Sequence, residues 1–373
     1  MKHPEFPLTD GLIYLNHAAV SPWPLRTCNA VKAFAEQNTH YGSHFYPDWL
    51  KKEAQLREQL RMLLNAPSTD DIALVKNTSE ALSFVAYGLD WRQGDNIVSS
   101  NEEFPSNRIP WQSLANQGVE FREAVLHNTQ SPEQALFDRV DRNTRLLTLS
   151  SIQFASGLRL DLEKIGAFCK ARNILFCIDA IQSLGAVKFD VQAYHADFVM
   201  ADGHKWMCGP EGLGVFYTTP TARDQLKLTQ FGWHMLENTH NYENCPWQIH
   251  PGARRFECGS PNMLGIHALS SSLSLLLEVG IEQIEHTIIK HAQSLMAGIA
   301  ENDRYELITH RAAPLTSGII LFRHKTRTDT ELLHRLQGQG VACAHRGAGI
   351  RLSPHFYHSE SEIMRVLDIL NDW

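Results

Sequence analysis

The sequence predicts an α/β protein with a large domain, built on a mostly parallel sheet between helices, and a smaller α+β domain at its C-terminal end. From about residue 72 to residue 217, continuous apolar runs alternate with amphipathic helical patterns. Apolar runs without polar alternation are typical of strands buried on both faces, as in parallel sheets. After Pro261 long helices replace this alternation, and the 373 residues are enough for two domains.

Short apolar runs mark the strands of the large domain. Residues 12–15 read as a short strand or extended arm that precedes them. The strands are predicted, in chain order, at residues 72–75, 96–100, 146–150, 175–178, 198–201 and 214–217.

Helical patterns lie before and between these strands. Residues 48–64 place three leucines on one helix face. Thr78 or Ser79 can cap the next helix, and Asp161 can cap a later one. The inward faces of the two capped helices are predicted to be Leu82, Val85, Ala86 and Leu89, and Leu162, Ile165 and Phe168.

The C-terminal part has a different pattern. Two long helices over about 264–279 and 284–302 precede strands near 318–323 and 349–353, and a final helix places Ile363, Val366, Leu367 and Leu370 on one face. We therefore predict a large domain over residues 22–262. Residues 1–21 and 263–373 are predicted to form the small domain.

Composition excludes several classes of protein. The net charge of -7 argues against nucleic-acid binding, which needs a basic face. The N-terminal segment MKHPEFPLTDG lacks the pattern of a signal peptide, and no apolar stretch is long enough to span a bilayer, so no membrane partner is expected. The seven cysteines form no CxxC pair, which disfavours a disulfide framework and favours the reducing cytoplasm.

Asp179 directly follows the apolar strand 175–178. Open α/β sheets bind ligands just beyond the carboxyl ends of their strands. A carboxylate at this place could pair with a protonated pyridine nitrogen and keep such a ring electron-withdrawing. The alternative, which this residue alone favours, is that Asp179 caps a helix that contains Ile181 and Leu184.

Lys205 lies in the loop ADGHKW, just after the strand 198–201. Its neighbours are a histidine, a tryptophan and following glycines, which is unusual for a solvated surface lysine. Partial burial would lower the pKa of its amine and favour imine chemistry. The alternative is an ordinary loop lysine.

The segment KNTSEA at residues 76–81 lies between a strand and a helix. Backbone N–H groups at the helix start, with the Thr78 hydroxyl, form a natural anion site. In isolation a plain helix cap explains this segment better. The order along the chain changes this balance, because a hydroxyl-capped helix, a strand-end Asp179 and a loop Lys205 are the three groups that a pyridoxal phosphate (PLP) site needs.

Other catalytic motifs are absent from the sequence. It has no phosphate-binding G-x-x-x-x-G-K-[ST] loop and no G-x-G-x-x-G fingerprint. H-E-x-x-H and the G-x-S-x-G nucleophile elbow are also missing. None of the nineteen histidines is paired with carboxylates at a ligand spacing, so no metal site is predicted.

The combination of DAIQ at 179–182 and ADGHKW at 201–206 resembles the class V aminotransferase family, which includes cysteine desulfurases, selenocysteine lyases, isopenicillin N epimerases and kynureninases. The resemblance extends over YLNHAAVSPWP near the start, KNTSEAL, FECGSPN at 256–262 and RLSPHFYHSESEI at 351–363. It implies fold type I, with a seven-stranded type of sheet in a PLP-binding large domain. It also implies a homodimer with a shared active site.

The resemblance assigns roles to individual residues. Lys205 matches the lysine that holds PLP as a Schiff base and later moves the substrate proton. Arg351 matches the arginine that grips the substrate carboxylate, with a surface salt bridge as the alternative. The matching cofactor-binding residues are Asp179 at the pyridine nitrogen, Gln182 at the phenolic oxygen, Thr78, Ser79 and His204 at the phosphate, and Ser260 at the phosphate of the neighbouring subunit.

Several positions depart from the family pattern. Desulfurases stack a histidine on the pyridine ring, where this chain has Phe104, which offers a flat face but no acid or base. Gln153 stands where relatives have Asn or Ser, and is expected on the phenolic side of the ring. Asp202 replaces a Ser or Thr two residues before His204, and is expected to point elsewhere or to be bridged by water.

The largest departure concerns sulfur. Desulfurases carry a nucleophilic cysteine on a loop between the last strands, whereas here GVACAHRGAGIRLSP passes from strand to strand with almost no loop. Cys343 falls inside the apparent strand, and a buried cysteine is usually inert. Cys208, close to Lys205, is expected to pack in the same way. A persulfide mechanism is therefore disfavoured.

These observations predict a PLP enzyme that binds an amino acid as an external aldimine. Transamination, epimerisation and β-elimination such as C–S cleavage all remain open, with a cysteine desulfurase or selenocysteine lyase as the alternative. His17, Arg254 or Arg255 would lie near the substrate side chain. A non-catalytic PLP-binding regulatory protein is the alternative of another class, and it predicts a defective lysine, aspartate or arginine.

Overall fold

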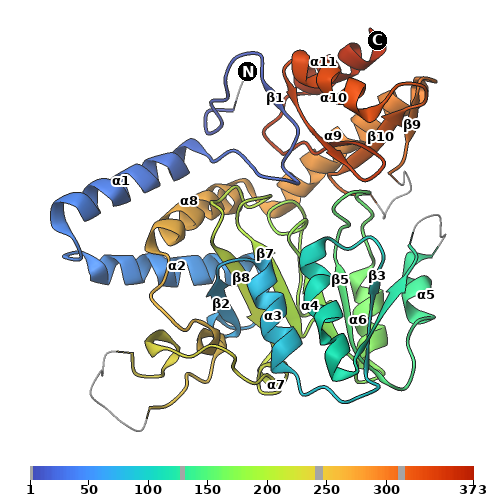
Figure 1. Cartoon of the computed structure of the whole chain (residues 1–373). Helices are drawn as coiled ribbons and strands as arrows, with labels where there is room; N and C mark the ends of the chain where they lie inside the picture. Colours follow the sequence, from blue (N-terminus) through green and yellow to red (C-terminus); the bar gives the residue numbers. More distant parts are fainter. Residues whose placement is uncertain (1–2, 127–130, 240–246, 310–315) are drawn as a thin grey trace.

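A seven-stranded sheet forms the centre of the large domain in the computed structural model, which describes residues 3–126, 131–239, 247–309 and 316–373 (Figure 1). The strand order is β2-β8-β7-β6-β5-β3-β4. The strands are β2 (Ile72–Val75), β3 (Asn96–Ser100), β4 (Glu120–Ala124), β5 (Thr144–Ser150), β6 (Leu175–Asp179), β7 (Phe198–Asp202) and β8 (Gly214–Thr218).

The sheet is mostly parallel, as predicted. Strands β4, β3, β5, β6 and β7 pair in parallel, and β8 pairs antiparallel with both β7 and β2. The parallel pairing brings the carboxyl ends of β5, β6 and β7 to one edge. Sequence patterns did not predict β4, whose residues Glu120–Ala124 are largely polar and partly exposed.

Both faces of the sheet are buried. Neighbouring side chains of one strand enter two separate hydrophobic clusters: Leu74 and Val199 belong to one, and Val75 and Met200 belong to the other. This explains why the strands read as continuous apolar runs. The helices of this domain are α3 (Thr78–Gly88), α4 (Ile109–Gln112), α5 (Pro132–Phe137), α6 (Leu162–Lys170) and α7 (Pro220–Arg223).

Two helix starts were predicted from hydroxyl or acidic caps. Asp161 caps α6, because its side chain accepts a hydrogen bond from the Lys164 amide. The predicted cap of α3 is wrong: Asn77 is the cap, and Thr78 is already the first helical residue. This shift of one residue leaves the Thr78 hydroxyl free for another partner.

A helical arm projects from the large domain (Figure 1). It contains α1 (Leu25–Tyr41) and α2 (Tyr46–Leu64), and both helices pack against α8 (Met263–Val279). Sequence patterns did not predict α1, because its apolar residues are few and only Thr27 is buried. Leu56, Leu60 and Leu63 of α2 are buried as predicted.

The small domain contains an antiparallel sheet in the order β12-β13-β10-β9. Its N-terminal strand β1 pairs in parallel with β11, so the first strand of the chain lies against the C-terminal part. The elements are β1 (Ile13–Tyr14), α9 (Ile281–Glu301), β9 (Tyr305–Leu307), β10 (Ile320–His324), α10 (Asp329–Gly338), β11 (Val341–Ala342), β12 (Ala344–Arg346), β13 (Gly349–Leu352) and α11 (Glu360–Asn371).

The predicted boundary between the domains lies after residue 262, at the start of α8. In the structure α8 packs against the arm, and most of its buried leucines join a core cluster of the central sheet. Ile284 and Ile288 of α9 belong to that same cluster, whereas Leu295 and Ile299 belong to the core of the small domain, so α9 packs against both cores. No single helix of the described residues is long and apolar enough to cross a membrane; α8 and α9 pass that test only as a pair bent by 82°.

Candidate active site

A cavity of about 270 Å³ lies at the carboxyl ends of β6 and β7, where the β12–β13 hairpin of the small domain meets the sheet. This size is slightly below the range of roughly 300–1,000 Å³ that is common for small-molecule sites. The polar and aromatic side chains that line it are Thr78, Phe104, Ser106, Phe154, Asp179, Asp202, His204, Lys205, Glu211, Arg346 and Arg351.

The start of α3 forms one end of the cavity. The Thr78 hydroxyl is buried there without a hydrogen-bond partner, as is Nδ1 of His204. Ser79 does not line the cavity, because its hydroxyl donates to Ser106 instead. An unpartnered hydroxyl at a helix N-terminus fits an anionic ligand such as a phosphate.

Asp202 lines this same end, so the first of the two alternatives expected for it, that it points elsewhere, is wrong. Its carboxylate accepts a hydrogen bond from the Thr78 amide, and its Oδ2 lies 3.7 Å from Nδ1 of His204. Its Oδ1 is buried and unpartnered. Burial raises the pKa of Asp202 to about 7, against the opposing charge of Lys205. Burial likewise lowers the pKa of His204 to about 4, so this imidazole is neutral.

Asp179 and Lys205 lie in the middle of the cavity. Asp179 is only 2% exposed, and Oδ1 accepts a hydrogen bond from the Ile181 amide. Residues 181–186 form turns, so Asp179 caps no helix there. Burial raises the pKa of Asp179 to about 7 and lowers the pKa of Lys205 to about 8, and each charge opposes the shift of the other. Lys205 Nζ lies 5.6 Å from the ring centroid of Phe104.

Arg351 forms the other end of the cavity. Its side chain is almost completely buried, and Nη1 donates to the Phe154 carbonyl oxygen over 2.6 Å. Nε and Nη2 have no partner. Burial lowers the pKa of Arg351 to about 9, and the neighbouring charge of Arg346 lowers it further. A guanidinium that has two nitrogens without a partner in a cavity can bind a carboxylate.

The two ends carry opposite charge. Glu211 lines the cavity, and its charge raises the pKa of Asp202 and of His204 at the α3 end. Arg346 also lines the cavity, and its charge lowers the pKa of Arg351 and of Lys205. Sequence reasoning missed both residues, since an exposed glutamate in a turn and an exposed arginine at the end of a strand carry no distinctive local pattern.

Two predicted cofactor ligands lie behind the cavity wall. Gln182 is buried; its Nε2 donates to the Ala18 carbonyl, and its Oε1 accepts a hydrogen bond from the Trp206 indole. Gln153 is also buried, and its amide donates to Glu103. Its Oε1 is unpartnered. Neither amide belongs to the cavity lining.

The residues predicted near the substrate side chain do not reach this cavity. His17 is fully buried: its Nδ1 bonds the Ser353 carbonyl oxygen, and its Nε2 bonds the Tyr357 hydroxyl. Arg254 donates to the Leu236 carbonyl, and Arg255 pairs with Asp224. Ser260 is exposed and lines a separate cavity.

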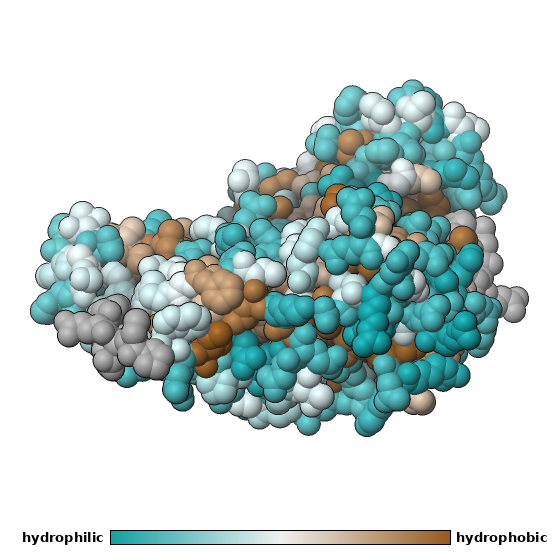
Figure 2. All heavy atoms as spheres, turned by 60° about the horizontal axis from the view of Figure 1, so that its bottom comes forward, coloured by the Kyte–Doolittle hydropathy of each residue, from teal (hydrophilic) through white to brown (hydrophobic). Residues whose placement is uncertain are grey.

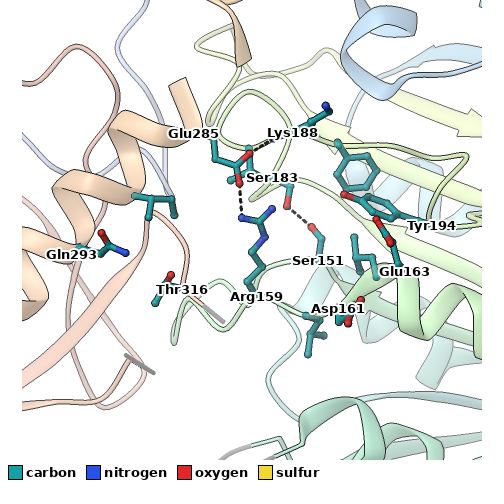
Figure 3. A pocket seen from close by; sticks show the side chains of 15 residues that line it. Ser151, Arg159, Asp161, Glu163, Ser183, Lys188, Tyr194, Glu285, Gln293 and Thr316 are labelled. Atoms are coloured by element: carbon teal, nitrogen blue, oxygen red, sulfur yellow. Dashed lines mark hydrogen bonds and ion pairs between the residues drawn. The ribbon is translucent and has the colours of Figure 1, made fainter. Parts of the chain in front are cut away.

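A larger cavity of about 490 Å³ lies between the large domain and α9 (Figure 3). Its polar groups bind one another, because Arg159 lies 2.6 Å from Glu285 and the Ser151 and Ser183 hydroxyls are 2.6 Å apart. None of its described lining side chains carries a buried polar atom without a partner. The smaller cavity, with five such atoms on Thr78, Asp202, His204 and Arg351, is therefore the better ligand site.

One group of potential metal ligands occurs among the described residues, far from the cavity lining. Oxygen and nitrogen atoms of Glu53, His234 and Glu257 lie within 4.8 Å of one another. Arg57 forms ion pairs of 2.6 Å and 2.7 Å with the two glutamates. The arginine therefore already supplies the positive charge that this cluster needs.

The cavity matches the groups of PLP and of an amino acid. The unpartnered Thr78 hydroxyl and the α3 amides suit its phosphate, and Asp179 suits a protonated pyridine nitrogen. Lys205 carries the amine that can bind its aldehyde carbon. The free edge of Arg351 suits the carboxylate of an amino acid.

Comparisons with known proteins agree with this assignment. Residues 13–366 match the model of the family described as Aminotransferase class-V. A probable cysteine desulfurase of Methanothermobacter thermautotrophicus is 30% identical, over 99% of this chain and 96% of that protein. A cysteine desulfurase of Yersinia pestis is 29% identical, over 85% of this chain and 80% of that protein.

Solved structures confirm the predicted fold. The apo structure of a cysteine desulfurase from Thermococcus onnurineus has a TM-score of 0.89 at 24% identity, and the alignment covers 99% of this chain and 96% of that one. A mutant of the C-DES protein, with glycine covalently linked to its PLP cofactor, has a TM-score of 0.92 at 23% identity over 99% and 98% of the two chains. The chain therefore belongs to the aminotransferase class-V family of PLP-dependent enzymes.

Proposed function

We propose that this enzyme removes the Cα proton of an amino acid, with Lys205 as both cofactor lysine and base. PLP, when bound, supplies an electron sink that stabilises negative charge at Cα. The observation that carries the proposal is the polarised cavity: Lys205 stands between an anion-binding helix start and the unpartnered Arg351. A regulatory protein without turnover is disfavoured, because lysine, aspartate and arginine are all present.

Each residue has a defined task in this proposal. Arg351 binds the α-carboxylate and orients the Cα–H bond toward Lys205. With a pKa near 8, the Lys205 amine is partly neutral near physiological pH and can accept that proton. Asp179 keeps the pyridine nitrogen protonated, and Thr78 with His204 holds the phosphate. Gln182 acts indirectly, by positioning Trp206 beside Lys205.

Phe104 limits the reactions that the cavity can support. It lines the cavity close to Lys205 and cannot donate or accept a proton. Epimerisation with one acid and one base on opposite faces therefore lacks its second group among the described residues. Transamination and β-elimination need only one acid–base group, so the geometry favours these two.

A cysteine desulfurase remains the second candidate, because several relatives carry that name. No described cysteine lines the cavity. Cys343 lies buried between β11 and β12, and burial raises its pKa to about 12. Cys208 is also buried, with a pKa raised to about 12. A persulfide needs a reactive thiolate, so these thiols do not support that route.

Spectroscopy and product analysis test the proposal. The purified protein loaded with PLP should absorb near ~420 nm, and borohydride should fix the cofactor on Lys205. Lys205→Ala should lose this band, while Arg351→Ala should keep it and lose amino-acid-dependent spectral shifts. Keto acid with ammonia indicates elimination, and keto acid with the pyridoxamine form indicates transamination. A wild-type protein that cannot be loaded with PLP would overturn the proposal.

The predicted homodimer also belongs to this proposal. Phe231, Trp233 and Trp247 expose between 36% and 63% of their surface, and hydrophobic surface gathers beside the helical arm in Figure 2. Ser260 is exposed and does not line the cavity that holds Lys205. This position suits a residue that binds the phosphate of the neighbouring subunit. Analytical ultracentrifugation should give twice the chain mass, and Trp247→Glu should weaken the association. A wild-type monomer would refute it.

A further inference from the structure

Two arginines from one hairpin line the substrate end of the cavity. Arg346 ends β12, and Arg351 lies in β13, with Ala344 opposite Arg351 and Gly349 opposite Arg346 in the antiparallel pairing. The hairpin is tight: Gly347 has a φ of +55°, and a side chain at Gly349 would meet the Phe322 carbonyl. This short turn holds both guanidinium groups near the same space.

Neither arginine has an anionic partner among the described residues. Arg351 donates only to the Phe154 carbonyl, and Arg346 donates only to the His345 carbonyl. The ion pairs of the other described arginines, such as those of Arg159 and Arg255, have no counterpart at Arg346, whose side chain is exposed, or at the buried Arg351. Both arginines line the cavity, and the charge of Arg346 lowers the pKa of Arg351 and of Lys205. The substrate end therefore carries positive charge that the protein leaves uncompensated.

The acidic side chains that line the cavity do not form ion pairs with these two arginines. Asp179 lies deep beside Lys205, while Asp202 and Glu211 lie at the α3 end. An amino acid with a neutral side chain brings one carboxylate, which neutralises Arg351 alone. A second anionic group on the substrate would neutralise Arg346 and gain a charge-assisted hydrogen bond.

We propose that the substrate is a short amino acid with an acidic side chain, whose α-carboxylate binds Arg351 and whose side-chain anion binds Arg346. This inference rests on the proposed function and adds the substrate class to it. The volume of about 270 Å³, which the cofactor must share, limits the substrate to a short chain. Carboxylate and sulfinate side chains both have the required charge and bonding geometry.

Calorimetric titration with unreactive ligands tests the second anionic contact directly. Succinate and succinamate have nearly the same shape, but succinamate replaces one carboxylate by a neutral amide. The PLP-loaded wild-type protein should bind succinate about tenfold more tightly or better, the scale of one hydrogen bond between charged groups. Arg346→Gln should remove this preference and leave succinamate affinity unchanged, whereas Arg346→Lys should keep most of it.

The control variant is Arg365→Ala, an exposed arginine on α11 outside the cavity lining. It should bind both ligands like the wild type. Equal affinity of the wild type for the two ligands would overturn the inference, as would an Arg346→Gln variant that loses affinity for both equally. Failure of the proposed function is distinguishable, because it appears as a missing ~420 nm band before any ligand is added.

Discussion

Replacement of Asp202 by asparagine should tighten PLP binding at alkaline pH. Asp202 lies at the α3 end of the cavity, where we propose that the phosphate binds; it accepts a hydrogen bond from the Thr78 amide and is only 12% exposed at its side chain. Lys205, His204 and Glu211 are the ionisable groups around it. Asp202→Asn keeps the acceptor oxygen for the Thr78 amide and removes the negative charge.

When PLP binds, Asp202 can either stay charged beside the phosphate or take up a proton, and the size of the effect follows from the cost of each. Two unit charges 4 Å apart repel by about 4 kcal/mol at an effective dielectric constant of 20. Protonation of Asp202 avoids this repulsion. Its pKa of about 7 means that the proton costs about 1.4 kcal/mol at pH 8 and little at pH 6. Protonation costs less than repulsion, so the wild type should bind PLP with Asp202 protonated. Asp202→Asn avoids this cost and should bind PLP about tenfold more tightly than the wild type at pH 8, and as tightly as the wild type at pH 6.

The assay is titration of the apoenzyme with PLP, followed by absorbance at pH 6, 7 and 8. The ratio of the two dissociation constants removes the pH dependence that both proteins share through Lys205 and the phosphate. Asp368→Asn, an exposed change on α11, is the matched control and should behave as the wild type. A ratio that stays near one at pH 8, or tighter binding by the wild type, would refute the reasoning.

Three further predictions concern stability and mechanism. Arg57→Met leaves two buried carboxylates unpaired and should lower the free energy of unfolding by about 3–5 kcal/mol in urea titrations, whereas Arg61→Met at an exposed pair should cost less than about 1 kcal/mol. Burial lowers the pKa of His355 to about 3, below its unfolded value near 6.5. The unfolded chain therefore binds the extra proton as pH falls from about 6.5 toward 3, and this histidine alone should cost about 1.4 kcal/mol per pH unit there. His355→Gln should show a shallower loss between pH 6 and pH 5, and an unchanged slope would contradict the assignment. Cys343→Ser should retain turnover in keto-acid assays, because the thiol is buried; loss of activity with normal PLP content would instead favour a persulfide mechanism.

Local sequence patterns were sufficient for the fold and for the centre of the site. Asp179 and Lys205 each come after an apolar strand, and the carboxyl ends of parallel strands share one edge. Taken singly, these two residues also fitted a helix cap and a loop lysine, and the order of Thr78, Asp179 and Lys205 along the chain favoured a cofactor site. The family resemblance added Arg351. The arm helix α1 was missed, because only one of its residues is buried and its apolar pattern is weak.

Tertiary structure decided how the ends of the cavity are built. Arg351 meets the Phe154 carbonyl across 197 positions of the chain, and His17 meets Ser353 across 336. The first contact leaves a guanidinium edge free for a ligand, while the second uses a histidine for packing. Such long-range contacts depend on how the two domains meet, and no local pattern encodes them.

The sequence by itself determined most of the strands, because hydrophobic periodicity is a local property. The order of the motifs and the family resemblance, which are also contained in the sequence, identified the lysine and the aspartate. Only the tertiary structure showed that Asp202 lines the cavity at the start of α3 and that Arg346 lines the same cavity as Arg351. The physical reason is that charge acts through space: its effect depends on which distant groups share the same buried volume.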